Sequence, residues 1–172
     1  MKALIFFLSI TLFVLFACTN NNAAKEKPNE ITASSQTIAQ FSYDTVHLTA
    51  GEIKDDSLDD AGYITGTTWE HAGINDSLLF KKFVKQLKIW TANGAKENIA
   101  TLLDYPLSNP QINDEKDFIA NYDKYFSDKL KKAVASQKLS QIYHDIHGIR
   151  TTNGELWFKK TDKGFKITAI ND

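Results

Sequence analysis

The sequence has a single cysteine, three prolines and no marked surplus of either charge among its 172 residues. One cysteine cannot form a disulfide within the chain or a cysteine-rich zinc cluster. The formal net charge of −1 lacks the basic surplus that nucleic-acid-binding surfaces carry, so no nucleic-acid partner is expected. With 42% hydrophobic and 24% charged residues, the composition is that of a globular protein and not of a collagen-like or wholly disordered chain.

The first residues have the pattern of a targeting segment. Lys2 is the only charge before Cys18, and Ala3–Ala17 is an apolar run interrupted only by one serine and one threonine. This run is shorter than the roughly 20 residues that cross a hydrocarbon core as a helix. A positive start, a short apolar stretch and a small residue at its end are typical of a secretory signal peptide, which we expect to occupy residues 1–17.

The end of this segment, Leu15-Phe16-Ala17-Cys18, resembles the lipobox of bacterial lipoproteins, although Phe16 departs from the residues usual at that place. The resemblance implies that Cys18 receives a diacylglycerol, becomes the first residue of the mature protein and is anchored to a membrane through its acyl chains. Thr19 follows it, not the aspartate that retains lipoproteins in the inner membrane. We therefore expect a cell-envelope protein, on the outer membrane facing the periplasm in a two-membraned bacterium. An ordinary secretory signal with an incidental Cys18 and an N-terminal transmembrane anchor are the alternatives.

Beyond the signal we expect a tether and a single domain. Residues 18–38 are polar and have too few large apolar side chains to offset the entropy of ordering, which predicts a flexible tether. Residues 39–172 are expected to form one domain. Its first part is hardest to interpret: residues 41–53 and Tyr63–Trp69 have the composition of strands, and Asp55–Asp60 has that of an acidic loop.

Apolar residues at helical spacing predict four helices in the middle of the domain. Asn75 or Asp76 is a suitable N-cap for the first helix, and Asn93-Gly94 is a suitable end. Its apolar side includes Phe80, Phe83 and Leu87, and its lysines, Lys81 among them, are expected on the remaining surface. The other helices are expected over Lys96–Leu103, from Asn113 or Asp114, and from Asp128.

The last third changes to the alternation of strands. Asn153-Gly154 is a strong hairpin signal, and Asp162-Lys163-Gly164 is a second turn. A three-stranded antiparallel meander is therefore expected over Gln141–Thr152, Glu155–Thr161 and Phe165–Ile170. Helices followed by strands predict an α+β fold, with the helices packed on one face of a curved sheet.

The hairpin turn also predicts the strand register, because a two-residue turn fixes which residues are opposite. Arg150 is then opposite Trp157, and Ile149 is opposite Phe158. Across the second turn the expected pairs are Thr161 with Phe165, Lys159 with Ile167 and Trp157 with Ala169.

One face of this sheet would carry the candidate ligand-binding residues His144, Arg150, Trp157 and Phe165. Arg150 over the Trp157 ring would form a cation–π pair, and such groups suit a small ligand in a mostly apolar pocket. The same residues also suit simple cross-strand pairs that cover a sheet face. We assign no catalytic residue and no cofactor, because nucleophile and phosphate-binding motifs are missing. No metal site is expected, since the spacing of His144 and His147 points them to opposite faces of a strand.

The segments FVKQLKIWTANGAKENIATLLDYPL, INDEKDFIANYDKYFSDKLKKAV, GIRTTNGELWFKK and FKITAIND resemble bacterial secreted proteins with the nuclear-transport-factor-2-like fold. The resemblance extends from Phe83 to Asn171 and implies a cone-like, cystatin-like domain. Such domains include ligand binders, isomerases and dehydratases, so the fold does not give the function.

Three functions are compatible with these features. The first is a non-catalytic, lipid-anchored protein that binds a small molecule, a peptide or a protein through the sheet face. The second is an isomerase- or dehydratase-type enzyme with His144 or Asp145 as general base. The third is an inhibitor or immunity-type protein that presents an exposed patch such as Asp55–Asp60.

Overall fold

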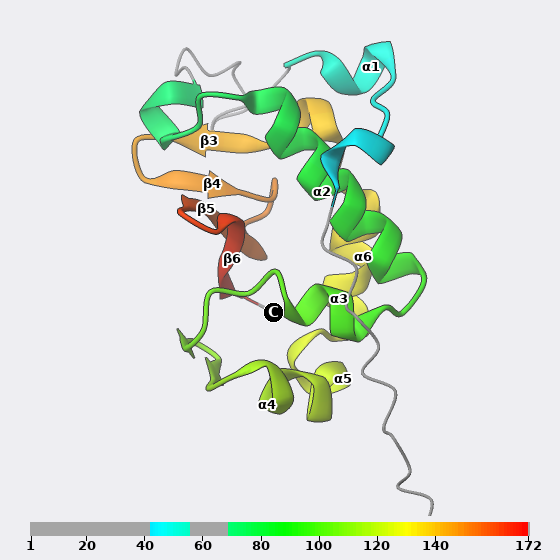
Figure 1. Cartoon of the computed structure of the whole chain (residues 1–172), viewed down its shortest axis with the longest axis vertical. Helices are drawn as coiled ribbons and strands as arrows, with labels where there is room; N and C mark the ends of the chain where they lie inside the picture. Colours follow the sequence, from blue (N-terminus) through cyan, green and yellow to red (C-terminus); the bar gives the residue numbers. More distant parts are fainter. Residues whose placement is uncertain (1–41, 56–68, 172) are drawn as a thin grey trace, which may run out of the picture. The chain divides into compact units, whose positions relative to one another are not determined.

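A computed structural model of the chain describes residues 42–55 and 69–171. All of them belong to one compact unit, Thr37–Asp172. Helices and antiparallel strands make up this part of the chain, so the predicted α+β class is confirmed. In chain order its elements are η1 Tyr43–Thr45, α1 Ala50–Ile53, η2 Trp69–Ala72, α2 Ser77–Ala92, α3 Lys96–Ala100, β1 Leu107–Ser108, β2 Gln111–Ile112, α4 Glu115–Ala120, α5 Tyr122–Tyr125, α6 Asp128–Ser136, η3 Leu139–Gln141, β3 Tyr143–Asp145, β4 Gly148–Arg150, β5 Leu156–Thr161 and β6 Gly164–Ile170 (Figure 1).

Helix α2 is the longest described helix and begins and ends where the sequence predicts. The Asp76 carboxylate accepts a hydrogen bond from the Leu79 backbone N–H at 2.8 Å, which satisfies one of the free donors at the helix start. At the other end Gly94 has a φ of +64°, a conformation that glycine adopts without a steric penalty. Helix α2 lies beside the stacked strands in Figure 1.

The core lies between α2 and the sheet. The Phe80 ring is 5.4 Å from that of Phe158 and 5.0 Å from that of Phe165. Phe83 contacts the same two rings at 6.0 and 5.7 Å. All four side chains are buried, and burying each one stabilises the fold by about 2 kcal/mol. Helix α2 therefore packs on one face of the sheet, in agreement with the prediction.

The third predicted helix is divided in two. It begins at Asp114, whose carboxylate accepts from the Asp117 N–H at 2.8 Å. It is interrupted at Asn121, whose Nδ2 donates to the Asp117 carbonyl at 3.1 Å and so ends α4 before α5 begins. The second predicted helix is shorter than expected, since α3 ends at Ala100. Helix α6 begins at Asp128, as predicted.

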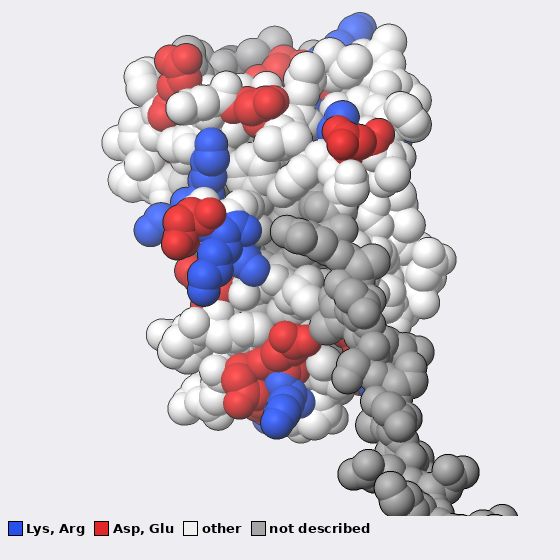
Figure 2. Space-filling view, viewed as in Figure 1, with Lys and Arg blue, Asp and Glu red and all other residues white. Residues whose placement is uncertain are grey.

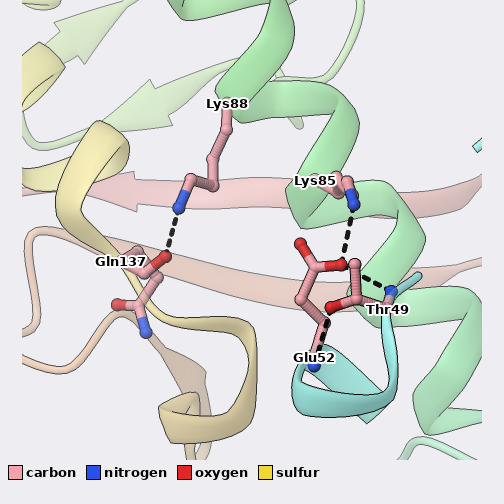
Figure 3. Close-up of polar contacts among 5 residues, drawn as sticks. All are labelled: Thr49, Glu52, Lys85, Lys88 and Gln137. Carbon is pink, nitrogen blue, oxygen red and sulfur yellow. Dashed lines mark hydrogen bonds and ion pairs between the residues drawn. The ribbon is translucent and has the colours of Figure 1, made fainter. Parts of the chain in front are cut away.

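The strand predicted over residues 41–53 is wrong, because local capping favours a helix there. The Thr49 hydroxyl accepts from the Glu52 N–H at 3.3 Å, and the Glu52 carboxylate accepts from the Thr49 N–H at 2.7 Å. This reciprocal capping box begins α1. Glu52 also forms a 2.7 Å ion pair with Lys85 of α2 (Figure 3).

Lys81 is also not where the sequence places it. Its side chain is buried, with 1% of its surface exposed. The ammonium group donates to the backbone carbonyls of Ile53 and Lys54 at the end of α1. The long Lys81 side chain thus donates to backbone carbonyls at the end of α1 that have no acceptor role within that helix. Helical spacing alone does not reveal such a contact.

The C-terminal sheet has four strands in the order β3-β4-β5-β6, not the three that were predicted. The stretch Gln141–Thr152 reverses at Ile146-His147, so it forms a hairpin and not one strand. The Asp145 carboxylate accepts from the His147 N–H at 2.6 Å, and Gly148 has a φ of +136°. The chain therefore reverses through an Asx turn at Asp145 that is followed by a glycine with positive φ. A small hairpin, β1–β2, was not predicted.

The predicted register is confirmed at the first turn and fails in part beyond it. Arg150 is opposite Trp157 and Ile149 is opposite Phe158, and Trp157 is opposite Ala169. A β-bulge follows, because the next pair is Phe158 with Ile167. The bulge inserts one extra residue into β6. The pairs beyond the bulge are therefore shifted by one residue. Lys159 is opposite Lys166 and not Ile167, and Thr161 is opposite Gly164 and not Phe165.

Several predictions lie outside the described residues: the signal peptide, the tether, and all of the acidic loop and second strand except Asp55 and Trp69. Trp69 begins the 3-10 helix η2. Within residues 42–55 and 69–171, no helix combines the length and apolarity required to cross a bilayer.

Candidate binding face

The sheet separates the four predicted ligand-binding residues into two pairs. Tyr143, Arg150, Trp157 and Ala169 are successive cross-strand partners, so they lie on one face, which we call the outer face. His144 is opposite Ile149, on the inner face that packs against the helices. The expectation that all four share one face is therefore wrong. The β3–β4 hairpin puts His144 in register with core residues, and the β-bulge shifts Phe165 to a position opposite Lys160, on the same inner face.

His144 and Phe165 are core residues. The His144 side chain is 1% exposed and its ring stacks on Trp69, with centroids 4.0 Å apart and planes 16° from parallel. Its Nδ1 is 3.1 Å from the Ile142 carbonyl oxygen, and its Nε2 is 4.0 Å from the Asp55 carboxylate. Phe165 is 5% exposed and packs on α2. Neither residue lines the depressions described below.

The two other predicted residues, Arg150 and Trp157, form a stack with a residue that the sequence did not indicate. The Arg150 guanidinium carbon is 3.7 Å from the centroid of the Tyr143 ring and 5.9 Å from that of Trp157. Its Nη1 donates to the Thr152 carbonyl at 3.2 Å. The predicted cation–π contact with Trp157 is present, but the closer partner is Tyr143. In a single strand over Gln141–Thr152, Tyr143 would have been on the opposite face from Arg150.

Two adjoining depressions lie along this face and a third lies beyond its end, beside α5 and the turn between β1 and β2; we call the three together the groove. The first, of about 490 Å³, lies at the β3–β4 hairpin. The second, also of about 490 Å³, shares Trp157 and Asn171 with the first, and the third, of about 370 Å³, shares Asn109 and Asn171 with the second. The lining residues are Tyr143, Asp145, His147, Arg150, Asn153, Gly154, Trp157 and Asn171 of the first, Asp104, Pro106, Ser108, Thr168 and Ala169 of the second, and Asn109, Pro110, Lys124, Tyr125 and Ile170 of the third.

The β-bulge shapes the middle of the groove. Because one extra residue of β6 is opposite Trp157, both Thr168 and Ala169 line the depression beside the indole. Bulges re-aim side chains in this way beside functional sites. Trp157 and Ala169 are both half-buried, so part of each residue stays exposed at the groove.

Charges in the groove are balanced. Its formally charged residues are two acidic ones, Asp104 and Asp145, and two basic ones, Lys124 and Arg150. On the face drawn in Figure 2, acidic and basic side chains of the described residues likewise lie side by side. The groove therefore has no electrostatic preference for a strongly charged ligand.

Two titratable groups of the groove already have partners. Partial burial and then the Asp117 carboxylate, to which its hydroxyl donates at 3.3 Å, raise the pKa of Tyr125. Tyr125 therefore stays protonated at neutral pH. Asp145 accepts from the Tyr143 hydroxyl at 3.2 Å and from the His147 N–H, so its role at this site is to hold the hairpin turn.

Metal-binding groups do not gather in the described part of the chain, where no cluster of three or more His, Cys, Asp or Glu residues is arranged to hold an ion. His144 and His147 differ in surroundings, the first buried and the second exposed.

A search against family models, curated proteins and solved structures finds no match to this chain.

Proposed function

We propose that this chain is a lipid-anchored cell-envelope protein whose domain binds another molecule through the groove and performs no chemistry of its own. Residues 1–17 would be removed and Cys18 would carry the lipid, with residues 18–38 as the tether. The helices on one face of an antiparallel sheet support the cone-like, nuclear-transport-factor-2-like arrangement that the resemblance implies. The periplasmic face of an outer membrane is the proposed location.

The observation that carries the binding function is the stack of Tyr143, Arg150 and Trp157 on the outer face, opposite the face that α2 covers. Aromatic and arginine side chains are the residues that most often dominate binding energy when a partner covers them. A catalytic role is not supported for His144, because its ring is packed between the sheet and Trp69. Asp145 is engaged in the hairpin turn.

The anchor is tested by changing Cys18 to serine in the full chain. Cells are grown with an alkyne-tagged fatty acid, fractionated, and the protein is detected by its label and its mass. We expect the unchanged protein in the membrane fraction with label and without residues 1–17, and the Cys18→Ser variant without label. A Cys18→Ser variant that is processed and located like the unchanged protein would support an ordinary secretory signal. An unprocessed chain in the membrane would support a transmembrane anchor.

The binding face is tested by placing a photo-crosslinking amino acid at His147, an exposed residue that lines the first depression of the groove. The matched control carries it at Ile89, a 42% exposed residue of α2 that does not line the groove. After irradiation of intact cells, we expect adducts from position 147 that position 89 does not give. Equal adducts at both positions, or none at either, would contradict binding through this face.

A further inference from the structure

We infer that the groove binds a neutral oligosaccharide chain. This inference rests on the proposed binding function and names the chemical class of the ligand. It follows from the dimensions of the groove, from the side chains that line it, and from the direction in which it crosses the sheet.

The dimensions favour a chain of linked units over a single small molecule. Each of the three depressions, at about 490, 490 and 370 Å³, falls within the roughly 300–1,000 Å³ of a site for one small molecule. Because neighbouring depressions share Trp157, Asn171 or Asn109, the three lie next to one another in a row. A ligand that occupies all three must itself be extended.

The lining chemistry matches a sugar. Asn109, Asn153 and Asn171 line the groove, and the amide of an asparagine offers both donors and an acceptor. A sugar hydroxyl likewise donates and accepts, so these amides can satisfy it in either role. Asn171 donates one amide hydrogen to the Gly154 carbonyl at 2.9 Å, which orients its side chain at the centre of the groove.

Trp157 supplies the complementary apolar surface. An indole combines a large flat apolar face with one polar N–H, and a sugar ring combines a face of C–H groups with an equatorial rim of hydroxyls. Trp157 lines both large depressions, and Thr168 and Ala169 line the second one beside it.

Charge argues against polyanions. An anionic polysaccharide or a nucleic acid would bring negative charge against Asp104 and Asp145, and Lys124 and Arg150 only balance these two carboxylates. Nucleic-acid-binding surfaces instead require a net basic stripe. A neutral chain has no such cost.

The direction of the groove argues against an extended peptide. Peptides that bind sheets usually add a strand at a free edge, whereas the groove crosses the strands from β3 to β6. The backbone of β6 at Ile167 already accepts from the Asp104 N–H at 2.9 Å and donates to the Leu102 carbonyl at 2.8 Å. That edge is therefore occupied, and a ligand in the groove meets side chains.

The test uses the full chain, purified in mild detergent, on an array of immobilised oligosaccharides. The probes are neutral fragments of β-glucan, α-glucan, mannan, xylan and chitin, anionic fragments of alginate and polygalacturonate, and a set of unrelated peptides. We expect at least one neutral fragment to be retained, with longer fragments retained more strongly than the monosaccharide. We expect Trp157→Ala to lower the affinity about tenfold, Trp157→Phe to lower it less, and the control Ile89→Ala to leave it unchanged.

Circular dichroism checks that each variant folds, and Ala169→Tyr is a second variant that fills the groove without removing the indole. Retention lost in Ala169→Tyr supports the inference even where Trp157→Ala is unfolded. Stronger retention of the anionic fragments or of the peptides overturns the inference, and so does an array that retains no probe. Binding of neutral fragments that is unchanged in both Trp157→Ala and Ala169→Tyr overturns it as well. If the crosslinks from position 147 are nevertheless obtained, binding through the groove stands and only the ligand class is wrong. If they are also missing, both proposals fail.

Discussion

Replacing Gln137 with alanine is the sharpest test of how the last helix is joined to the sheet. Gln137 is the C-cap of α6 and is 5% exposed. Its Nε2 donates toward the carbonyls of Lys138 and Gln141 at 2.8 and 3.0 Å and toward the Thr152 hydroxyl at 3.1 Å. Its Oε1 accepts from the Thr152 N–H at 2.8 Å. Its backbone carbonyl accepts from the Lys88 ammonium group (Figure 3).

The expected loss follows from the number of bonds that the amide can make at once. Nε2 has two hydrogens for its three acceptors, so two of those bonds form together, and the bond to Oε1 is a third. At about 1 kcal/mol net for each bond, the sum is about 3 kcal/mol. Thr152 is exposed and recovers a bond to water in the variant, so we expect Gln137→Ala to lower the free energy of unfolding by about 2 kcal/mol.

Gln137→Glu separates the hydrogen bonds from the packing. Glutamate has nearly the same shape and keeps an acceptor for Thr152, but at neutral pH it faces two carbonyl oxygens with a carboxylate. We therefore expect it to be as destabilising as Gln137→Ala. The control is Gln111→Ala, because Gln111 is exposed and its amide contacts only the Asn113 side chain, at 3.4 Å.

The measurement is urea unfolding of residues 37–172, followed by tryptophan fluorescence and extrapolated linearly to water. The control is expected to change the free energy by less than about 0.5 kcal/mol. A Gln137→Glu variant as stable as the unchanged protein would show that volume, not hydrogen bonding, is what this position provides. Gln137→Ala within the range of the control would refute the reasoning altogether.

Two further predictions concern the first helix and the hairpin that the sequence did not reveal. Burial pushes the pKa of Glu52 up, but hydrogen bonds from Lys85 and Thr49 outweigh burial and hold it below its ordinary value. The ionised form is thus favoured by folding, and its stabilisation is present above the ordinary pKa and lost as the pH falls through the folded pKa. Glu52→Gln should therefore destabilise at neutral pH and do so less in acid, by urea unfolding at both; a difference independent of pH would contradict this. Gly148→Ala should cost about 2 kcal/mol in the same assay, because its φ is +136°. Gly51→Ala, in α1 with open space around its Cα, should have no such cost, and equal losses from the two would exclude backbone strain as the cause.

The sequence was informative where local chemistry decides the structure. The N-cap at Asp76, the helix end at Asn93-Gly94 and the hairpin at Asn153-Gly154 depend on residues within a few positions of one another. The confirmed pairing of Arg150 with Trp157 follows from that hairpin, because a short turn leaves one register.

The sequence placed Arg150 and Trp157 correctly on one face of the sheet, but it placed Tyr143 and His144 on the wrong faces. A strand alternates faces at every residue, so the unrecognised turn at Ile146-His147 moved Tyr143 to the outer face and His144 to the core. Asp145 and Gly148 were the local signal of that turn, an Asx residue followed by a residue with positive φ. The bulge in β6, in contrast, has no glycine or other clear signal in Ile167–Ala169.

By itself, the sequence determined the class of fold and the starts of α2, α4 and α6, because each depends on neighbouring residues and on the periodicity of apolar side chains. The targeting pattern around Cys18 stays a prediction. Only the tertiary structure decided that Lys81 is buried, that His144 stacks on Trp69 and that Asn109, Trp157 and Asn171 line one groove. Those contacts join residues far apart in the chain. Their geometry depends on how the sheet is turned, bulged and packed, and no local pattern contains that information.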